Sequence, residues 1–149
     1  MIEDWDDSEY CLMAVRENPI NLEFVKNQTP KICLEAVKRD GQALKFVKNQ
    51  TPEMCLEAVK DDGHALGYVK EQTSEICLEA VKQYGYALQH VKEQTPEICL
   101  ETVKQNGFAL KWVKNQTPLI IHYLKKYHIS LYELYKKENR ITISQKEME

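Results

Sequence analysis

A 22-residue period constrains this chain more than any other feature of its sequence. Each period is marked by the tripeptide Gln-Thr-Pro, which recurs at residues 28–30, 50–52, 94–96 and 116–118, with Gln-Thr-Ser at 72–74. Thr suits the position before a helix because its hydroxyl accepts a free backbone N–H of the first turn. Pro suits the first helical position, where no N–H is needed. Each copy of the tripeptide therefore predicts the start of a helix.

The unit Thr95–Gln116 illustrates the pattern within one period. Its first predicted helix runs from Pro96 to Asn106, with Cys99, Thr102 and Val103 at the i, i+3 and i+4 positions of one face. This spacing is typical of an amphipathic helix and not of a strand. The first half of each unit is therefore expected to be helical, with a small apolar face that includes the cysteine.

A glycine follows the first helix of each complete unit, at Gly41, Gly63, Gly85 and Gly107. Gly commonly ends a helix because it adopts positive φ without a Cβ clash, and this is the role we expect for these glycines. A second, shorter helix is then predicted from Phe108 to Asn115, before the next Thr-Pro.

Neither predicted helix reaches the roughly 12–15 residues that an isolated helix needs for marginal stability. Units of this kind bury their apolar faces only by stacking on one another. The sequence therefore predicts an all-α fold, an α-solenoid of about six short helix-turn-helix repeats with divergent terminal caps. The expected single domain covers residues 1–138, with repeats at 7–28, 29–50, 51–72, 73–94 and 95–116 and a degenerate cap at 117–138.

The two ends of the predicted solenoid depart from the consensus. In the first repeat Asn18-Pro19 replaces the glycine, and in the cap Ile129 replaces it. The cap is predicted to contain helices at 118–127 and 130–138, and residues 139–149 are expected to be a loose polar tail. Terminal repeats are commonly atypical because one of their faces meets water.

Composition narrows the function classes. The chain of 149 residues is 43% hydrophobic and 29% charged, with a net charge of −3 and both signs well mixed. This composition is typical of a globular protein and gives no global bias toward nucleic acid or membranes. The acidic N-terminus lacks the basic and apolar regions of a signal peptide. We therefore expect no membrane partner and a cytoplasmic, intracellular location.

The five cysteines occur once per repeat, at Cys11, Cys33, Cys55, Cys77 and Cys99. Packed helices lie roughly 8–10 Å apart, beyond the roughly 7 Å limit on the Cα separation of a disulfide. The odd number and the absence of CxxC spacing also argue against a disulfide or zinc framework. Five free thiols in the core are expected.

The AVK…G…AL…VK pattern, with junctions such as QTPEICLETV at residues 94–103, resembles a repeat family known only as a domain of unknown function. That family is common in giant viruses of amoebae and is found in some bacteria. The resemblance covers residues 7–116 well and the cap weakly, and Pro19 and Ile129 depart from the family's glycine. It implies a helical repeat protein with an interaction role and no catalytic residues to transfer. One version is a viral or bacterial protein, in the host cytoplasm if viral, that binds or inhibits a host or defence protein.

Comparison of the copies within the chain separates constant from variable positions. The Cys, Leu, Ala and Val positions and the Gln before each Thr hardly change. Two rows vary and are rich in aromatic residues, and at i, i+4 spacing they are expected to share one edge of the second helices. Because aromatic residues are suited to anchor interfaces, this edge is the predicted protein-binding site. Its residues are Gln42, His64, Tyr86, Phe108, Phe46, Tyr68, His90 and Trp112, with Lys45 and Lys111 between them. The alternative is that these aromatics only fill space between neighbouring second helices.

Lysine ladders support a second hypothesis, a nucleic-acid-binding solenoid. One row is Lys26, Lys48, Lys70, Lys92, Lys114 and Lys136, and the other is Arg16, Lys38, Lys60, Lys82, Lys104 and Lys126. An acidic row, Glu35, Glu57, Glu79 and Glu101, stands three residues before the second basic row and predicts i, i+3 ion pairs. The acidic rows are as dense as the basic ones, which favours the protein-binding hypothesis.

Catalytic and cofactor motifs are missing from the sequence. The four histidines show no metal-ligand spacing, and there is no GxGxxG or P-loop. We therefore expect no enzymatic activity, no cofactor and no metal, and a protein partner, with self-association through the end caps as a further option.

Overall fold

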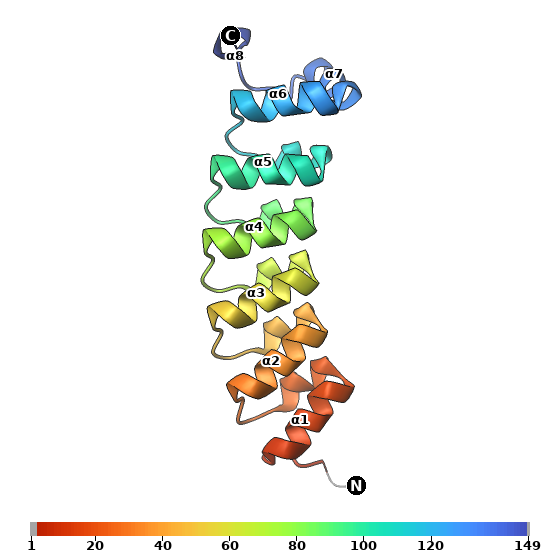
Figure 1. Cartoon of the computed structure of the whole chain (residues 1–149), viewed down its shortest axis with the longest axis vertical. Helices are drawn as coiled ribbons and strands as arrows, with labels where there is room; N and C mark the ends of the chain where they lie inside the picture. Colours follow the sequence, from red (N-terminus) through yellow and green to blue (C-terminus); the bar gives the residue numbers. More distant parts are fainter. Residues whose placement is uncertain (1–2, 149) are drawn as a thin grey trace.

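The computed structural model describes residues 3–148, apart from the side chain of Gln145. The first six α-helices of the chain are stacked along the long axis of the molecule, with the chain ends at opposite ends of the stack (Figure 1). A short 3₁₀-helix comes after each of the first five and forms a second layer. Within residues 3–148 every regular element is helical. The predicted helical solenoid is confirmed.

The helices recur at the 22-residue period of the sequence. The stacked α-helices are α1 (Ser8–Glu17), α2 (Pro30–Arg39), α3 (Pro52–Asp61), α4 (Ser74–Gln83), α5 (Pro96–Gln105) and α6 (Pro118–Tyr127). The 3₁₀-helices are η1 (Pro19–Phe24), η2 (Gly41–Phe46), η3 (Gly63–Tyr68), η4 (Gly85–His90) and η5 (Gly107–Trp112). The C-terminal elements are α7 (Ile129–Lys137) and α8 (Gln145–Met148). Each α-helix packs on the next α-helix, and each 3₁₀-helix packs on the next 3₁₀-helix.

Threonine caps start five of the α-helices, as the tripeptide predicts. The hydroxyls of Thr29, Thr51, Thr73, Thr95 and Thr117 each accept the backbone N–H three residues on, at 3.2–3.4 Å. The predicted first helix of the fifth repeat, 96–106, is confirmed to within one residue at its end.

The second helix of each repeat differs from the prediction. The segment expected as an α-helix over 108–115 is the 3₁₀-helix Gly107–Trp112, and it ends because Val113 is extended. A segment of six residues is too short to gain from α-helical hydrogen bonding, whereas 3₁₀-helices occur in short pieces of this kind. Ala109 and Leu110 are nevertheless buried, as the apolar pattern predicts.

The role predicted for the glycines is wrong. Among the described residues no glycine has positive φ. The residue before Gly41, Gly63, Gly85 and Gly107 is extended and ends the α-helix. At Asp40, Asp62 and Asn106, and at Asn18 before Pro19 in the first repeat, its side chain accepts the N–H two residues on. Glycine is required instead by close packing, because a Cβ on Gly63 would lie 2.7 Å from the carbonyl oxygen of Ala80 in the next repeat.

The core is one column between the two helical layers. The cysteines, the Ala-Val pairs of the α-helices and the Ala-Leu pairs of the 3₁₀-helices are buried. All five cysteines are free thiols, as expected. Thr102 is buried as well, and its hydroxyl donates to the carbonyl oxygen of Ile98 at 2.8 Å.

The C-terminal cap contains the two predicted helices, with α7 one residue earlier than expected at each end. Residues 140–143, expected as part of a loose tail, are held against the last repeat. The carbonyl of Arg140 and the N–H of Thr142 bond to the side chain of Gln116, and Ile141 and Ile143 pack against the core. Within the described residues, no helix has both the length and the apolar character needed to cross a bilayer.

Candidate interaction surface

A ladder of glutamines ties the repeats together. Gln28 donates to the carbonyl of Phe46 at 2.8 Å and accepts the N–H of Lys48 at 2.9 Å, both in the next repeat. Gln50, Gln72 and Gln94 make the same pair of bonds, at 2.8–3.0 Å, to residues 18 and 20 positions ahead. The cysteine five residues after each of these four glutamines contacts the same amide oxygen. We call this set, with Gln116, the glutamine ladder, and it explains why glutamine is constant there.

Lysines of the first row also form hydrogen bonds between neighbouring repeats. The ammonium groups of Lys48, Lys70 and Lys92 donate to the backbone carbonyl of the preceding lysine in the row, at 3.2, 3.0 and 2.9 Å. Lys26 instead pairs with Asp6 at 2.9 Å. Because their donors are directed at the protein itself, these lysines are poorly placed to form a track for phosphates.

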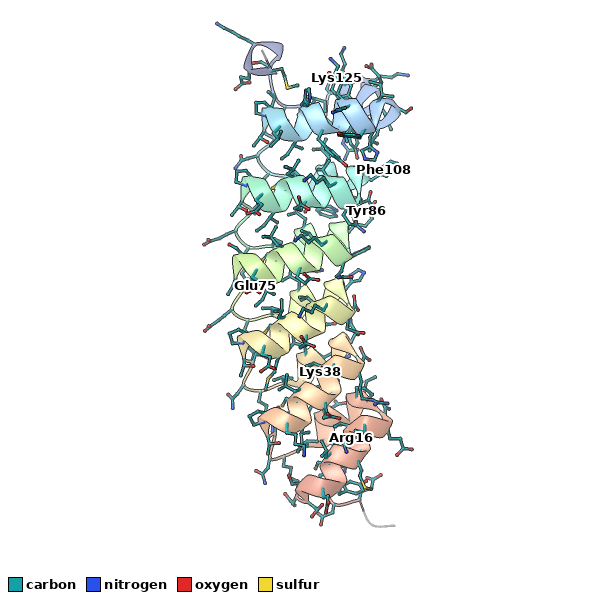
Figure 2. All side chains as sticks on the ribbon, in the orientation of Figure 1. Arg16, Lys38, Glu75, Tyr86, Phe108 and Lys125 are labelled. Atoms are coloured by element: carbon teal, nitrogen blue, oxygen red, sulfur yellow. The ribbon has the colours of Figure 1, made fainter. Side chains whose placement is uncertain are left out.

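The second basic row makes some of the ion pairs expected from the sequence. Lys60 pairs with Glu57 at 3.1 Å and Lys104 with Glu101 at 2.7 Å, which confirms the i, i+3 prediction at these positions. Glu35 pairs across the repeat junction with Arg16, at 2.8 Å. Figure 2 places Arg16 and Lys38 on the face formed by the α-helices, away from Tyr86 and Phe108.

The first predicted aromatic row lies near the start of the 3₁₀-helices, at the edge where the α-helices end. Tyr86 and Phe108 mark this edge in Figure 2, and Glu75 lies at the opposite edge. Phe108 is 55% exposed. His64 is exposed, Tyr86 is half-buried, and Gln42 is half-buried and donates to Asp62. In this row Gln42 is therefore hydrogen-bonded to the next repeat, whereas His64 and Phe108 are open to solvent.

The second predicted row lies at the last residue of each 3₁₀-helix. Tyr68 is 40% exposed and Trp112 is 38% exposed, whereas Phe46 and His90 are half-buried. The two rows do not align along one helix by i, i+4 spacing, because the second helices are 3₁₀-helices. A 3₁₀-helix has three residues per turn, so the first row aligns with the position three residues on, that of Lys45 and Lys111.

An aromatic array connects three repeats at this edge. The ring of His64 stacks on that of Tyr84 at 4.0 Å between centroids, and Tyr84 meets Tyr86 edge-on at 5.5 Å. The ammonium of Lys111 lies 5.1 Å from the centroid of Tyr86 and 5.2 Å from that of Trp112. We call these five residues, His64, Tyr84, Tyr86, Lys111 and Trp112, the aromatic array. Contacts of this kind are favourable beyond the apolar area that they bury.

Tyr84 is the member of the array that sequence reasoning missed as a site residue. It occupies the position that Asn or Asp holds in the other repeats, and it makes no side-chain cap bond to η4. The replacement of Asn or Asp by Tyr at this position was the signal in the sequence. A residue that lacks the usual cap hydrogen bond is expected to make other contacts. Lys45, in contrast, lies 4.7 Å over Phe46 and outside the array.

Arg140 occupies the next place in the second row, which is formed by the last residues of η1–η5. Gln94 donates to the carbonyl of Trp112, and Gln116 donates in the same way to the carbonyl of Arg140. The repeat alignment would have placed Leu134 at this position. Because α7 is longer than a 3₁₀-helix, the row passes from Trp112 to a guanidinium that lies 4.9 Å from the centroid of Tyr135.

The titratable groups of the core are not activated. Burial raises the pKa of Cys33, Cys55, Cys77 and Cys99 above the ordinary value of 9.0. At Cys11 burial raises the pKa and nearby carboxylates, first Asp7, raise it further. Residues 3–148 contain no group of three His, Cys, Asp or Glu side chains placed to hold a metal ion.

Comparison with known proteins bears on this architecture. The sequence model of the family described as "Domain of unknown function (DUF4116)" matches residues 29–73, 51–95 and 73–126. The matched windows overlap and together span well over half of the chain. The chain belongs to this family. No curated protein and no solved structure matches it at a significant level. The family match agrees with the repeat period and leaves the activity of the chain open.

Proposed function

We propose that the chain is a non-catalytic module that binds another protein through the aromatic array and the neighbouring exposed rings. The observation that carries this proposal is the contiguous set of aromatic contacts, which are made by side chains, whereas the glutamine ladder bonds to the backbone of the 3₁₀-helices. Exposed aromatic side chains on a rigid support lose little entropy on binding and are typical interface anchors.

The hypothesis of a nucleic-acid-binding solenoid has less support. Three lysines of the first row donate to backbone carbonyls, and two of the second row pair with glutamates. An extended phosphate chain needs several lysines free along one path. The raised thiol pKa values likewise support a non-catalytic role, because thiolates are the reactive form of cysteine.

The setting that we propose is the cytoplasm, where thiols stay reduced. A core with one free cysteine in each of five repeats suits that compartment. In the version suggested by the family resemblance, the chain is a viral or bacterial protein that binds, and thereby inhibits, a host or defence protein.

A pull-down from native lysate, with and without nuclease, tests the proposal. We expect a captured protein that survives nuclease and is lost when Tyr86, Phe108 and Trp112 are all replaced by alanine. The matched control is Leu119→Ala, because Leu119 is 61% exposed and occupies the repeat position of Glu75, at the opposite edge. Capture that disappears with nuclease, or that survives the triple replacement, would overturn the proposal.

Thermal melting of the same variants addresses the alternative that the rings only fill space. Phe108→Ala alone should change Tm little, since Phe108 is mostly exposed, whereas the triple variant also loses the half-buried ring of Tyr86 and the contact of Trp112 with Lys111. A large fall in Tm with capture retained would show that these rings stabilise the fold and do not bind a partner.

A further inference from the structure

A small pocket lies where η5 meets the C-terminal segment, next to the aromatic array. Its volume is about 190 Å³, and its walls include Lys111, Gln116, Tyr135, Arg140 and Thr142. Lys111 comes from η5, Tyr135 from α7, and Arg140 and Thr142 from the residues after α7. The pocket therefore depends on the C-terminal segment that takes the place of a further repeat.

Among the described residues, the lining of this pocket includes the two basic residues Lys111 and Arg140 and no acidic residue. Lys111 makes no ion pair with a described residue, and its ammonium is held between the rings of Tyr86 and Trp112. Arg140 reaches Glu138 outside the pocket at 3.4 Å, with both side chains largely exposed. An exposed pair of that kind is weak and leaves the guanidinium available to a better partner.

The C-terminal part of the chain is basic. Residues 117–148 contain six Lys or Arg side chains and three Glu. The hydroxyl of Tyr135 donates to the carbonyl of Phe108 at 3.1 Å, so it is already satisfied. The Gln116 amide is held by the backbone of residues 140 and 142, which fixes one wall. The pocket is thus a recess beside two basic residues, with walls that also include the apolar Leu110 and Val113.

We propose that this pocket binds a carboxylate side chain of an acidic peptide segment in the partner protein. The carboxylate lies between Lys111 and Arg140, and a neighbouring apolar side chain of the peptide packs on Trp112. The occupant is argued from charge complementarity, since Lys111 has no ion pair with a described residue and Arg140 has only the exposed pair with Glu138, and such cations favour an anionic partner. This inference rests on the proposed function and names the kind of segment that is bound.

A short acidic peptide fits this edge better than a nucleic acid does. The same edge carries Asp40, Asp61 and Asp62 toward the N-terminus, which would repel a phosphate chain that continued along it. The rings of His64, Tyr84 and Tyr86 already contact one another, so they do not present separate faces to successive bases.

Fluorescence anisotropy with labelled probes tests the inference. The probes are a fluorescein-labelled hexapeptide of alternating Glu and Leu, the same peptide with Gln for Glu, and a labelled oligouridylate of equal length. We expect the Glu peptide to bind at least roughly tenfold more tightly than the Gln peptide, as the loss of charge-assisted hydrogen bonds implies. Equal affinity of the two peptides, or tighter binding of the oligouridylate, would overturn the inference.

Variants of the full chain locate the binding. Lys111→Met and Arg140→Gln should each weaken binding of the Glu peptide by roughly tenfold. Arg140→Gln keeps the backbone carbonyl that Gln116 uses. The matched control is Lys38→Met, which removes a lysine from the face formed by the α-helices, away from the pocket. The control should bind as the parent does, and an equal loss in the control would contradict the assignment to this pocket.

The pull-down separates this inference from the proposed function. A protein that is captured by Lys111→Met and Arg140→Gln but lost by the triple alanine variant would leave the proposed function standing and overturn the pocket. A partner lost by all three variants, with unchanged urea midpoints for Lys111→Met and Arg140→Gln, supports both.

Discussion

The interior repeat junctions and the C-terminal junction are built from the same hydrogen bonds and from different steric contacts. In the interior, Gly63 faces the backbone carbonyl of Ala80, and Gln50 bonds to the backbone of the next 3₁₀-helix and the residues after it. At the C-terminus, Gly107 faces the side chain of Leu131, and Gln116 bonds to the segment after α7.

This difference shows which part of the junction is specific to a repeat. The glutamine needs only one carbonyl and one N–H at the right spacing, which any extended segment supplies. The glycine needs a neighbouring α-helix at close range. In the cap, Ile129 stands at the glycine position and is 52% exposed, so a further repeat could not pack there as the interior repeats do.

Alanine at the glycine positions should give the largest effect. Gly63→Ala should lower the free energy of unfolding by about 3 kcal/mol, because a rigid backbone carbonyl lies 2.7 Å from the new Cβ. Gly107→Ala should lower it by about 1 kcal/mol, because the end of the Leu131 side chain can move aside. Urea unfolding of both variants measures the difference.

The control for this pair is Gly67→Ala, in the same 3₁₀-helix as Gly63. Its Cβ would meet only the ring of His90, at 3.4 Å. Its stability should equal or slightly exceed that of the parent, since alanine reduces the entropy of the unfolded chain. Equal losses at all three glycines would contradict the distinction between the junctions.

The glutamine ladder should show a smaller effect that differs in kind between the junctions. Gln50→Ala removes two bonds to backbone groups and should cost about 2 kcal/mol of unfolding free energy. Gln116→Ala should cost about 1 kcal/mol and release residues 140–148, since a terminal segment held by few contacts frays locally.

Limited proteolysis with urea unfolding separates these two outcomes. Early cleavage within residues 140–148 is expected for Gln116→Ala and not for Gln50→Ala. If both variants were cleaved alike in the C-terminal segment, Gln116 would have no particular role in holding that segment.

The smallest expected effect is a change in the free energy of unfolding with pH. It should come from the buried cysteine thiols. Because burial raises the thiol pKa above its ordinary 9.0, the unfolded chain loses its thiol protons first as the pH rises. The thiol contribution to stability is therefore complete below the unfolded pKa and falls as the pH rises toward the folded pKa.

Urea unfolding between about pH 8 and pH 10 measures this fall. Cys55→Ala should show a shallower decline than the parent. Ile121→Val, at the corresponding position of the cap, should decline in parallel with the parent. Parallel curves for all three proteins would show that Cys55 does not contribute.

The fold could be predicted from the sequence because the period repeats every strong local signal. Thr51 and Pro52 mark a helix start wherever they stand, and the burial of Cys55 is implied by its helical spacing. The type of the second helix could not be predicted, since Ala109, Leu110 and Val113 suit an apolar face in either an α-helix or a 3₁₀-helix. The glycine role depended on a neighbour in space that only the structure places.

The candidate site was predicted less completely for the same reason. Tyr86 and Trp112 were found because they vary between copies, but Tyr84 stands at a position that usually caps a helix. The repeat period does not predict the position of Arg140. Gln116 donates to the carbonyl of Arg140, 24 residues ahead, whereas the other glutamines donate to a carbonyl 18 residues ahead. An alignment of the copies at the 22-residue period would place Leu134 where the structure places Arg140.

The glutamine ladder also governs how such a chain can change in length. Removal of residues 51–72 would bring Gln50 against the carbonyl of residue 90 and the N–H of residue 92, which are the groups that Gln72 now uses. Duplication or loss of one whole unit in the gene therefore creates no new kind of junction. Each such event nevertheless brings different side chains next to one another along the edge, so recombination can produce new recognition surfaces from an unchanged scaffold.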